Sequence, residues 1–175
     1  MNEDNINEDY LYYSSPAYLG ESGITQPCIT AMAAILTSAF RPEKITAVLG
    51  DYDNYNHAAV LFLVWNWADR GLTIIPDGFG THGGEGGAGL AAVLGLIKFY
   101  KIPLLQVRIQ SKKAFNELAQ GKLTEEMFDE VQQAQASNWN FYRASEVQKV
   151  KKGKKQFLEI KWLDGRTDFT IELPQ

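Results

Sequence analysis

Long apolar runs separated by short polar segments dominate the first two thirds of the chain. Residues 27–39 have the composition of a buried helix, with Thr25 as its expected cap. Residues 44–49 are rich in β-branched side chains and predict a short buried strand. Residues 57–70 are apolar almost all round, which predicts a helix covered on more than one side, with Asn54 or Asn56 as its cap.

The same pattern continues through a second and a third strand. Gly71 is the expected C-cap glycine of the preceding helix. Residues 72–75 predict a strand, residues 88–100 a helix and residues 102–109 another strand. Because short links join these elements, we expect parallel strands and right-handed crossovers. The predicted fold class is therefore α/β, a Rossmann-like parallel sheet flanked by helices.

The two ends of the chain differ from this core. Residues 1–22 are acidic and tyrosine-rich, and we expect an irregular arm that docks by its aromatic side chains. Residues 23–111 form the predicted α/β core. Residues 112–175 predict a helical segment and a β-hairpin, packed on the core as one domain. The expected elements of this last region are helices at 112–119 and 124–136, the second capped by Thr124, and strands at 155–163 and 166–173 around Asp164-Gly165.

Composition limits the cellular locations that the sequence allows. The chain has 175 residues and a net charge of −4, and its single cysteine, Cys28, excludes an intrachain disulfide. We read Cys28 as a small core residue. No apolar run is long enough to cross a membrane, and the acidic start lacks the features of a signal peptide. A cytoplasmic location is therefore expected.

Charge is spread unevenly along the chain. Residues 1–110 hold 6 Lys/Arg and 11 Asp/Glu, whereas residues 111–175 hold 11 and 10. Six lysines gather near the predicted hairpin: Lys149, Lys151, Lys152, Lys154, Lys155 and Lys161. Such a turn contacts nucleic acid less often than it serves as a solubilising edge that blocks strand pairing. A nucleic-acid partner is not expected from the sequence.

The most informative segment is glycine-rich. Seven of the twelve residues from Gly78 to Gly89 are glycine, out of 15 in the chain. Between a strand and a helix N-terminus, such a loop can turn its N–H groups toward an anion. The alternative is a flexible loop, or glycines that let a helix pack closely on the sheet. No Walker lysine follows, and no acidic residue ends the strand at 102–109, which disfavours a P-loop and a standard dinucleotide site.

Two stretches carry a resemblance to a known superfamily. Residues 45–50, Ile-Thr-Ala-Val-Leu-Gly, precede a predicted helix, and residues 70–75, Arg-Gly-Leu-Thr-Ile-Ile, lead into the glycine-rich segment. This arrangement resembles the Rossmann-like superfamily of DNA-processing protein A and the lonely-guy phosphoribohydrolases, over residues 44–109. The resemblance implies nucleotide-phosphate binding at Gly50, Gly78, Gly80, Gly83 and Gly84. The Pro-Gly-Gly-x-Gly-Thr-x-x-Glu signature of the lonely-guy enzymes is absent, so their hydrolase activity is not carried over.

Polar residues are expected to converge at one edge of the sheet. In a parallel sheet the loops after the first two strands open on the same side. The residues concerned are Asp51, Asp53, Asn54 and His57 from one loop, and Asp77, Thr81, His82 and Glu85 from the other. Carboxylates and histidines can act as acid or base. Their alternative role is to cap turns and helix starts. A divalent ion is conceivable there, but no metal motif supports one, and no cofactor is expected.

The sequence thus predicts a protein that binds a nucleotide or a nucleotide-derived phosphate ligand, with hydrolysis left open. The candidate catalytic residues are Glu85, His82 and Asp77. The candidate ligand-binding residues are Gly50, Asp51, Asp53, His57, Gly78, Gly80, Thr81, Gly83, Gly84, Gly86 and Gly87. Two alternatives stay open, a non-catalytic nucleotide sensor and an interaction or immunity-type protein with a purely structural glycine loop. The apolar segment 57–70 is the expected contact of a homo-oligomer.

Overall fold

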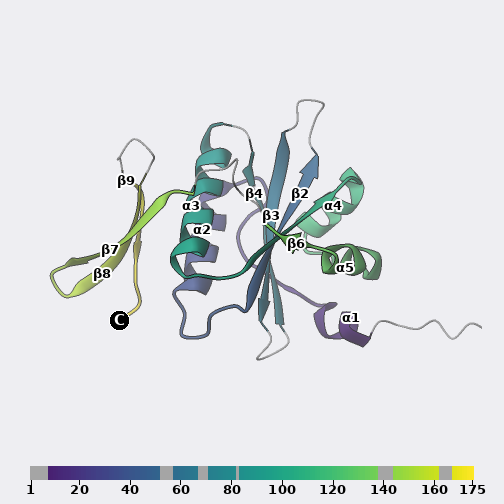
Figure 1. Cartoon of the computed structure of the whole chain (residues 1–175), viewed down its shortest axis with the longest axis horizontal. Coiled ribbons are helices and arrows are strands. Elements are labelled where there is room, and N and C mark those ends of the chain that lie inside the picture. Colours follow the sequence, from purple (N-terminus) through teal and green to yellow (C-terminus); the bar gives the residue numbers. More distant parts are fainter. Residues whose placement is uncertain (1–7, 52–56, 67–70, 82, 138–143, 162–166) are drawn as a thin grey trace, which may run out of the picture.

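The computed structural model describes residues 8–51, 57–66, 71–81, 83–137, 144–161 and 167–175. Figure 1 shows four layers: a small C-terminal sheet, a pair of helices, a larger sheet, and a second group of helices. The strands are β1 Ala17–Tyr18, β2 Lys44–Asp51, β3 Ala58–Asn66, β4 Gly71–Gly80, β5 Leu104–Ile109, β6 Gln135–Ala136, β7 Glu146–Lys152, β8 Lys155–Lys161 and β9 Thr167–Glu172. The helices are α1 Glu8–Tyr13, α2 Thr25–Leu36, α3 Glu85–Phe99, α4 Lys112–Ala119 and α5 Glu125–Gln132.

The larger sheet is mixed, with the strand order β1-β4-β3-β2-β5-β6. Strand β3 runs antiparallel to both of its neighbours, β2 and β4. Among the described strands, the parallel pairs lie farther out, between β1 and β4 and between β2 and β5. The α/β class and the flanking helices are confirmed, whereas the expectation of an all-parallel sheet is wrong at its centre.

The predicted helix at 57–70 is a strand instead. Its described part, β3, lies in the middle of the sheet, and its side chains alternate between two apolar layers. Val60 and Phe62 face one layer, while Leu61 and Trp65 face the other. A strand covered on both faces reads as a continuous apolar run, which resembles a buried helix. Because this chain itself covers β3, the strand offers no helical surface to a second subunit.

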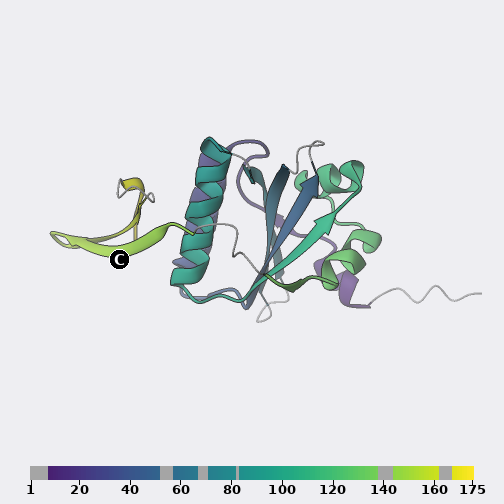
Figure 2. The ribbon, with the colours of Figure 1, turned by 45° about the horizontal axis from the view of Figure 1, so that its top comes forward.

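Two crossovers place α2 and α3 side by side on one face of the sheet. Helix α2 leads from β1 to β2, and α3 leads from β4 to β5, in each case between strands that point the same way. Both helices therefore begin at the edge of the sheet where β4 ends. Figure 2 shows the two helices stacked between the larger sheet and the C-terminal sheet.

The opposite face is covered by α4, α5 and the N-terminal arm. Ser111 and Thr124 cap α4 and α5 by accepting hydrogen bonds from Ala114 N and Met127 N, so the predicted cap at Thr124 is confirmed. The arm is partly helical rather than wholly irregular, and its aromatic side chains do dock. Tyr13 packs edge-on against Trp65 at 5.2 Å and stacks on Phe128 at 5.8 Å between ring centroids.

The C-terminal sheet has the order β7-β8-β9, with both pairs antiparallel. The predicted hairpin corresponds to β8 and β9, and its expected turn at Asp164-Gly165 lies outside the described residues. Strand β7 was not predicted, because its two valines, Val147 and Val150, lie on opposite faces and leave no apolar alternation among the polar residues. Leu158 and Ile160 on β8 are buried against the α2–α3 layer, which joins the small sheet to the main core.

Candidate functional site

A cavity of about 550 Å³ opens where α2 and α3 begin. Its size is within the usual range of small-molecule sites. Four segments line it: the end of β4, the start of β3, and the first residues of both helices. We call this cavity the paired-helix pocket. Its lining residues are Gly23, Ile24, Thr25, His57, Ala58, Ala59, Asp77, Gly78, Phe79, Gly80, Glu85 and Gly86.

Both helix N-termini at this pocket lack a side-chain cap. Ile24 precedes α2 and Gly84 precedes α3, and neither residue supplies a hydrogen bond from its side chain to the helix. The first N–H groups of a helix have no partner within the helix, and the helix dipole gives that end a partial positive charge. Two such ends at one cavity make its polar wall attractive to an anion.

Thr25 is the first residue of α2 rather than its cap. Its hydroxyl donates to the Gly78 carbonyl at 2.6 Å, and the side chain is buried. This bond fixes the start of α2 against the end of β4. The expected cap role of Thr25 is therefore wrong, and its hydroxyl joins two walls of the pocket instead.

The acidic side chains of the pocket lie at its rim. Asp77 is half-buried and accepts a hydrogen bond from the Ser22 hydroxyl at 2.6 Å. Glu85 stands in the first turn of α3 and is exposed. His57 is exposed at the entrance to β3. A carboxylate in the first turn of a helix is stabilised by the dipole, so Glu85 also has a structural reason to be there.

Thr81 closes the strand edge beside the pocket. Its hydroxyl accepts from Ala58 N at 2.8 Å, and its own N–H donates to the Ala58 carbonyl at 2.9 Å. The start of β3 and the end of β4 are therefore held together beyond the regular ladder. Thr81 positions the wall that carries His57 and Gly80, and it is not among the lining residues.

The single cysteine lies behind the pocket wall. Cys28 is buried, and its thiol donates to the Glu21 carbonyl at 3.3 Å. Burial raises the pKa of the Cys28 thiol above its ordinary value. It outweighs hydrogen bonds to the Glu21 and Gly78 backbone, which lower the pKa, and the charges of Asp77 and Glu21 add smaller upward effects. The thiol therefore stays protonated near neutral pH and is a poor nucleophile.

The glycines of the segment have different reasons to be glycine. A Cβ on Gly78 would lie 2.5 Å from the Ile24 carbonyl oxygen, and one on Gly89 would overlap the Thr25 methyl group, so both allow α2 to pack closely. Gly84 has a φ of +89°, which disfavours a side chain, although the space around it is open. Gly83 meets nothing within 4 Å of an added Cβ. Close helix packing therefore explains why positions 78 and 89 are glycine, but it does not explain Gly83.

The structure brings together part of the predicted site. Six predicted residues line the paired-helix pocket: His57, Asp77, Gly78, Gly80, Glu85 and Gly86. Thr81, Gly83, Gly84 and Gly87 lie close by in the chain, at the end of β4 or the start of α3. Asp51 ends β2 and pairs with Ala58, whereas Asp53, Asn54 and His82 lie outside the described residues.

Gly50 is the predicted site residue that lies elsewhere. It is buried, and a Cβ there would come within 2.5 Å of the Phe115 ring from α4. Phe115 belongs to the apolar layer on the face of the sheet opposite α2 and α3. Gly50 therefore makes room for α4, and the structure does not bring it to the pocket.

Sequence reasoning missed the α2 side of the pocket. Gly23, Ile24 and Thr25 line it, yet they carry no chemical group that marks a site. Only the topology could reveal them, because it sets the start of α2 beside the start of α3. Among the described residues there is no group of three or more His, Cys, Asp or Glu side chains placed to hold a metal ion.

The element order also bears on the superfamily resemblance. That resemblance rests on a helix after the strand at 44–50, whereas β2 is followed by the antiparallel strand β3.

None of the described helices is long and apolar enough to span a membrane.

Comparisons with known proteins concern the fold. Neither a family model nor a curated protein matches the chain. A solved chain of respiratory complex I from Thermus thermophilus is similar in structure, with a TM-score of 0.53 and 17% sequence identity. The match covers 72% of this chain and 98% of that chain. At this level of identity the likeness shows a shared fold and nothing about function.

Proposed function

We propose that the paired-helix pocket binds a small ligand that carries a phosphate group, such as a nucleotide. The observation that carries the proposal is the convergence of two helix N-termini without side-chain caps on one cavity. Unpartnered N–H groups and two aligned dipoles favour an anion at that wall. The phosphate would lie between the residues around Ile24 and those around Glu85.

The remaining walls favour a ligand with more than a phosphate. Asp77 and Glu85 repel an anion but accept hydrogen bonds from hydroxyl or amino groups. Ala58, Ala59 and Phe79 add an apolar surface. A nucleotide combines these features, because its sugar and base carry donors and an apolar ring while its phosphate is anionic. Free phosphate alone should bind more weakly than a nucleoside monophosphate.

One substitution separates anion binding from fold stability. Ile24 is 43% exposed and has the extended backbone that capping residues adopt. Ile24→Asp should therefore cap α2 and stabilise the free protein by ~1 kcal/mol. The same carboxylate would accept from the Gln26 N–H, which the phosphate needs, because the next residue, Pro27, has no N–H. Ile24→Leu keeps the apolar side chain and serves as the matched control.

The experiment is a thermal-shift and calorimetric titration with adenosine, AMP, ADP and inorganic phosphate. A nucleotide at 100 times its Kd should stabilise the wild type and Ile24→Leu by ~2.7 kcal/mol. Ile24→Asp should melt at a higher temperature without ligand and lose most of that shift. The proposal is wrong if no compound shifts the wild type, or if Ile24→Asp binds as tightly as Ile24→Leu.

Turnover is tested in the same samples. Asp77 and Glu85 are the described carboxylates of the pocket, and hydrolysis of a nucleotide bond needs an acid and a base. Base or phosphate released by the wild type but not by Glu85→Gln, with binding retained, favours an enzyme. Binding without release in either protein favours a sensor.

A second candidate function is binding to a protein partner, in which case the glycines between Gly78 and Gly89 serve only the packing of the fold. Two observations favour it: packing explains Gly78 and Gly89, and Phe40 is 79% exposed beside an apolar groove of about 560 Å³. Large exposed apolar side chains often mark interaction sites. A molar mass that rises with concentration in the wild type, but not in Phe40→Asp, would support self-association through this groove.

A further inference from the structure

Strand β4 is irregular just before it ends at the paired-helix pocket. Between two regular pairs of the ladder, one residue of β3, Leu61, lies opposite three residues of β4, 76–78. We call residues 76–78 the β4 bulge. Pro76 has no N–H to give to the ladder, and proline inside a sheet is confined to edges and bulges. Bulges change the direction of the side chains they carry and occur often beside active sites.

The β4 bulge lies against the turn that leads into α2. The Ser22 hydroxyl donates to Asp77 Oδ1 at 2.6 Å. The Thr25 hydroxyl donates to the Gly78 carbonyl, also at 2.6 Å. A Cβ on Gly78 would lie 2.5 Å from the Ile24 carbonyl oxygen, so the two backbones are in close contact. These contacts fix Asp77 beside the start of α2, where the phosphate of the proposed function would lie.

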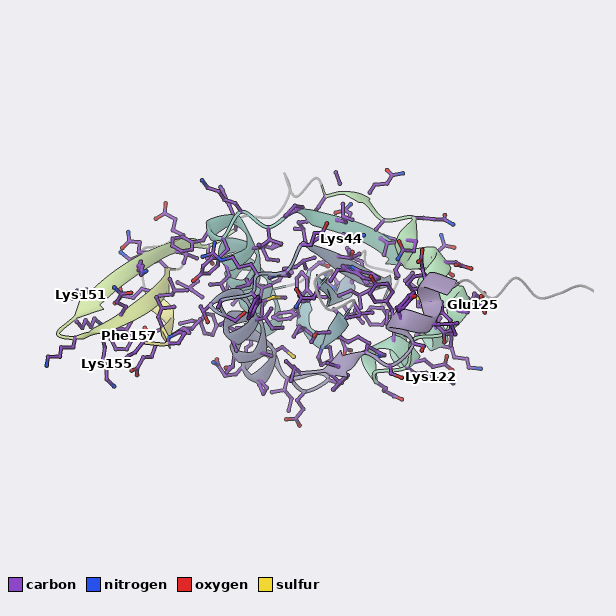
Figure 3. The ribbon with its side chains drawn as sticks, turned by 90° about the horizontal axis from the view of Figure 1, so that it is seen from below. Lys44, Lys122, Glu125, Lys151, Lys155 and Phe157 are labelled. Atoms are coloured by element: carbon purple, nitrogen blue, oxygen red, sulfur yellow. The ribbon has the colours of Figure 1, made fainter. Side chains whose placement is uncertain are left out.

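Asp77 brings a negative charge to the pocket. Its strand neighbours Ile75 and Phe79 are buried in the apolar layer, whereas Asp77 is half-buried and lines the pocket. No ion pair joins Asp77 to any residue that the structure describes. Figure 3 shows Lys151 and Lys155 of the C-terminal sheet at one end of the molecule, away from the larger sheet that carries Asp77. A carboxylate here repels the anion that the helix ends attract, unless the ligand also brings hydrogen-bond donors.

Given the phosphate site proposed above, we propose that Asp77 selects ribonucleotides by accepting hydrogen bonds from the 2′- and 3′-hydroxyl groups of the sugar. The two oxygens of a carboxylate offer about four acceptor sites, and Ser22 uses one of them. The remaining sites suit two neighbouring donors, as a vicinal diol provides. In a nucleotide the sugar adjoins the phosphate, so its hydroxyls are the donors closest to the start of α2.

The bond from Ser22 also has a structural effect, because it anchors the turn before α2 to the β4 bulge. Asparagine preserves that effect, since its Oδ1 accepts from Ser22 in the same way, but it removes the charge and replaces the second acceptor by a donor. Asp77→Asn therefore separates ligand recognition from the construction of the pocket. Glu21→Gln is the matched control, because it removes one charge from the same turn, and Glu21 is exposed and does not line the pocket.

Isothermal titration calorimetry of the full chain with AMP and 2′,3′-dideoxy-AMP measures what the hydroxyls contribute. The wild type and Glu21→Gln should bind AMP at least about tenfold more tightly than dideoxy-AMP, as expected for hydrogen bonds to a charged group. Asp77→Asn should lose most of this preference, because it binds AMP more weakly. Its affinity for dideoxy-AMP should be unchanged or higher, because the repulsion between Asp77 and the phosphate is gone.

The outcomes distinguish this role of Asp77 from the phosphate site. If the wild type binds neither nucleotide, the phosphate site itself is wrong. Equal affinity of the wild type for both nucleotides would overturn the role of Asp77 and leave the phosphate site standing. The same preference in Asp77→Asn as in Glu21→Gln would also overturn it. So would an equal loss of both affinities in Asp77→Asn, which would show that Asp77 only builds the pocket.

A further titration with inosine monophosphate tests whether Asp77 binds the base instead of the sugar. This nucleotide keeps the ribose hydroxyls and lacks the 6-amino group of AMP. The wild type should bind it with about the same preference over dideoxy-AMP that AMP shows. A preference for AMP over inosine monophosphate that disappears in Asp77→Asn would overturn the proposal, because the amino group would then be the partner of Asp77.

Discussion

The contact between Gly89 and Thr25 holds α2 beside α3 and allows a sharp test of the pocket's construction. A Cβ on Gly89 would overlap the Thr25 Cγ2 methyl group. Thr25 cannot easily rotate away, because its hydroxyl is bonded to the Gly78 carbonyl at 2.6 Å. Gly89→Ala should therefore force the two helices apart. Thr25→Ser removes the methyl group and keeps the hydroxyl, so it should make room for the added side chain.

The expected free energies follow from opposing effects. Overpacking a core costs ~1–3 kcal/mol, while replacing glycine by alanine inside a helix gains ~1 kcal/mol. Gly89→Ala in the wild type should thus destabilise by up to ~2 kcal/mol. Thr25→Ser should lose ~1 kcal/mol with its buried methyl group. In the Thr25→Ser background the alanine should be neutral or stabilising, which gives a favourable coupling of ~2 kcal/mol.

Urea denaturation followed by circular dichroism measures all four proteins of this cycle. Gly95→Ala is the matched control, because its Cβ would overlap the Ser145 carbonyl, which Thr25→Ser cannot relieve. Gly95→Ala should destabilise equally in both backgrounds. Additivity of Gly89→Ala and Thr25→Ser within ~0.5 kcal/mol would refute the close contact between the helices.

Three other predictions concern single positions. Gly50→Ala should cost ~1–3 kcal/mol by overpacking, and Phe115→Leu should relieve part of that cost in a double-mutant cycle. Gly84→Ala should cost ~1 kcal/mol through its φ of +89° alone, so a second substitution at a neighbour should not restore stability in urea titrations. Because burial raises the pKa of the Cys28 thiol above 9.0, the unfolded chain releases that proton first. Below pH 9 this thiol should make its full contribution to the free energy of unfolding. That contribution should be lost as the pH rises through the folded pKa. In Cys28→Ala the free energy of unfolding should therefore depend less on pH in this range.

The sequence identified most elements but misjudged the centre of the sheet. Residues 58–66 have no polar side chain before Asn66, so the alternation of a strand is invisible when both faces are apolar. Its β-branched and aromatic content, with Val60, Phe62 and Val64 in one short run, was the available signal. Periodicity alone could not separate this strand from a buried helix.

Several candidate site residues nevertheless converge, for a reason that the parallel-sheet prediction did not contain. β2 and β4 are both antiparallel to β3, so they point the same way and end at the same edge. His57 and Asp77 therefore meet at one pocket as they would in a parallel sheet. The role of each glycine could not be read from the sequence, because a close helix contact and a ligand contact both require the absence of a Cβ. At Gly50 and Gly89 the space for a Cβ is taken by Phe115 and Thr25 respectively, and each of these residues is distant in the chain from its glycine.

Backbone amide chemical shifts of the ¹⁵N-labelled protein, titrated with AMP, test the central claim most directly. The account predicts that the largest shifts fall on two separate segments, Gly23–Thr25 and Glu85–Gly86, because the phosphate accepts hydrogen bonds from both helix N-termini. The same segments should move less in Ile24→Asp. Shifts confined to other surfaces, or none at saturating AMP, would contradict a phosphate site between α2 and α3.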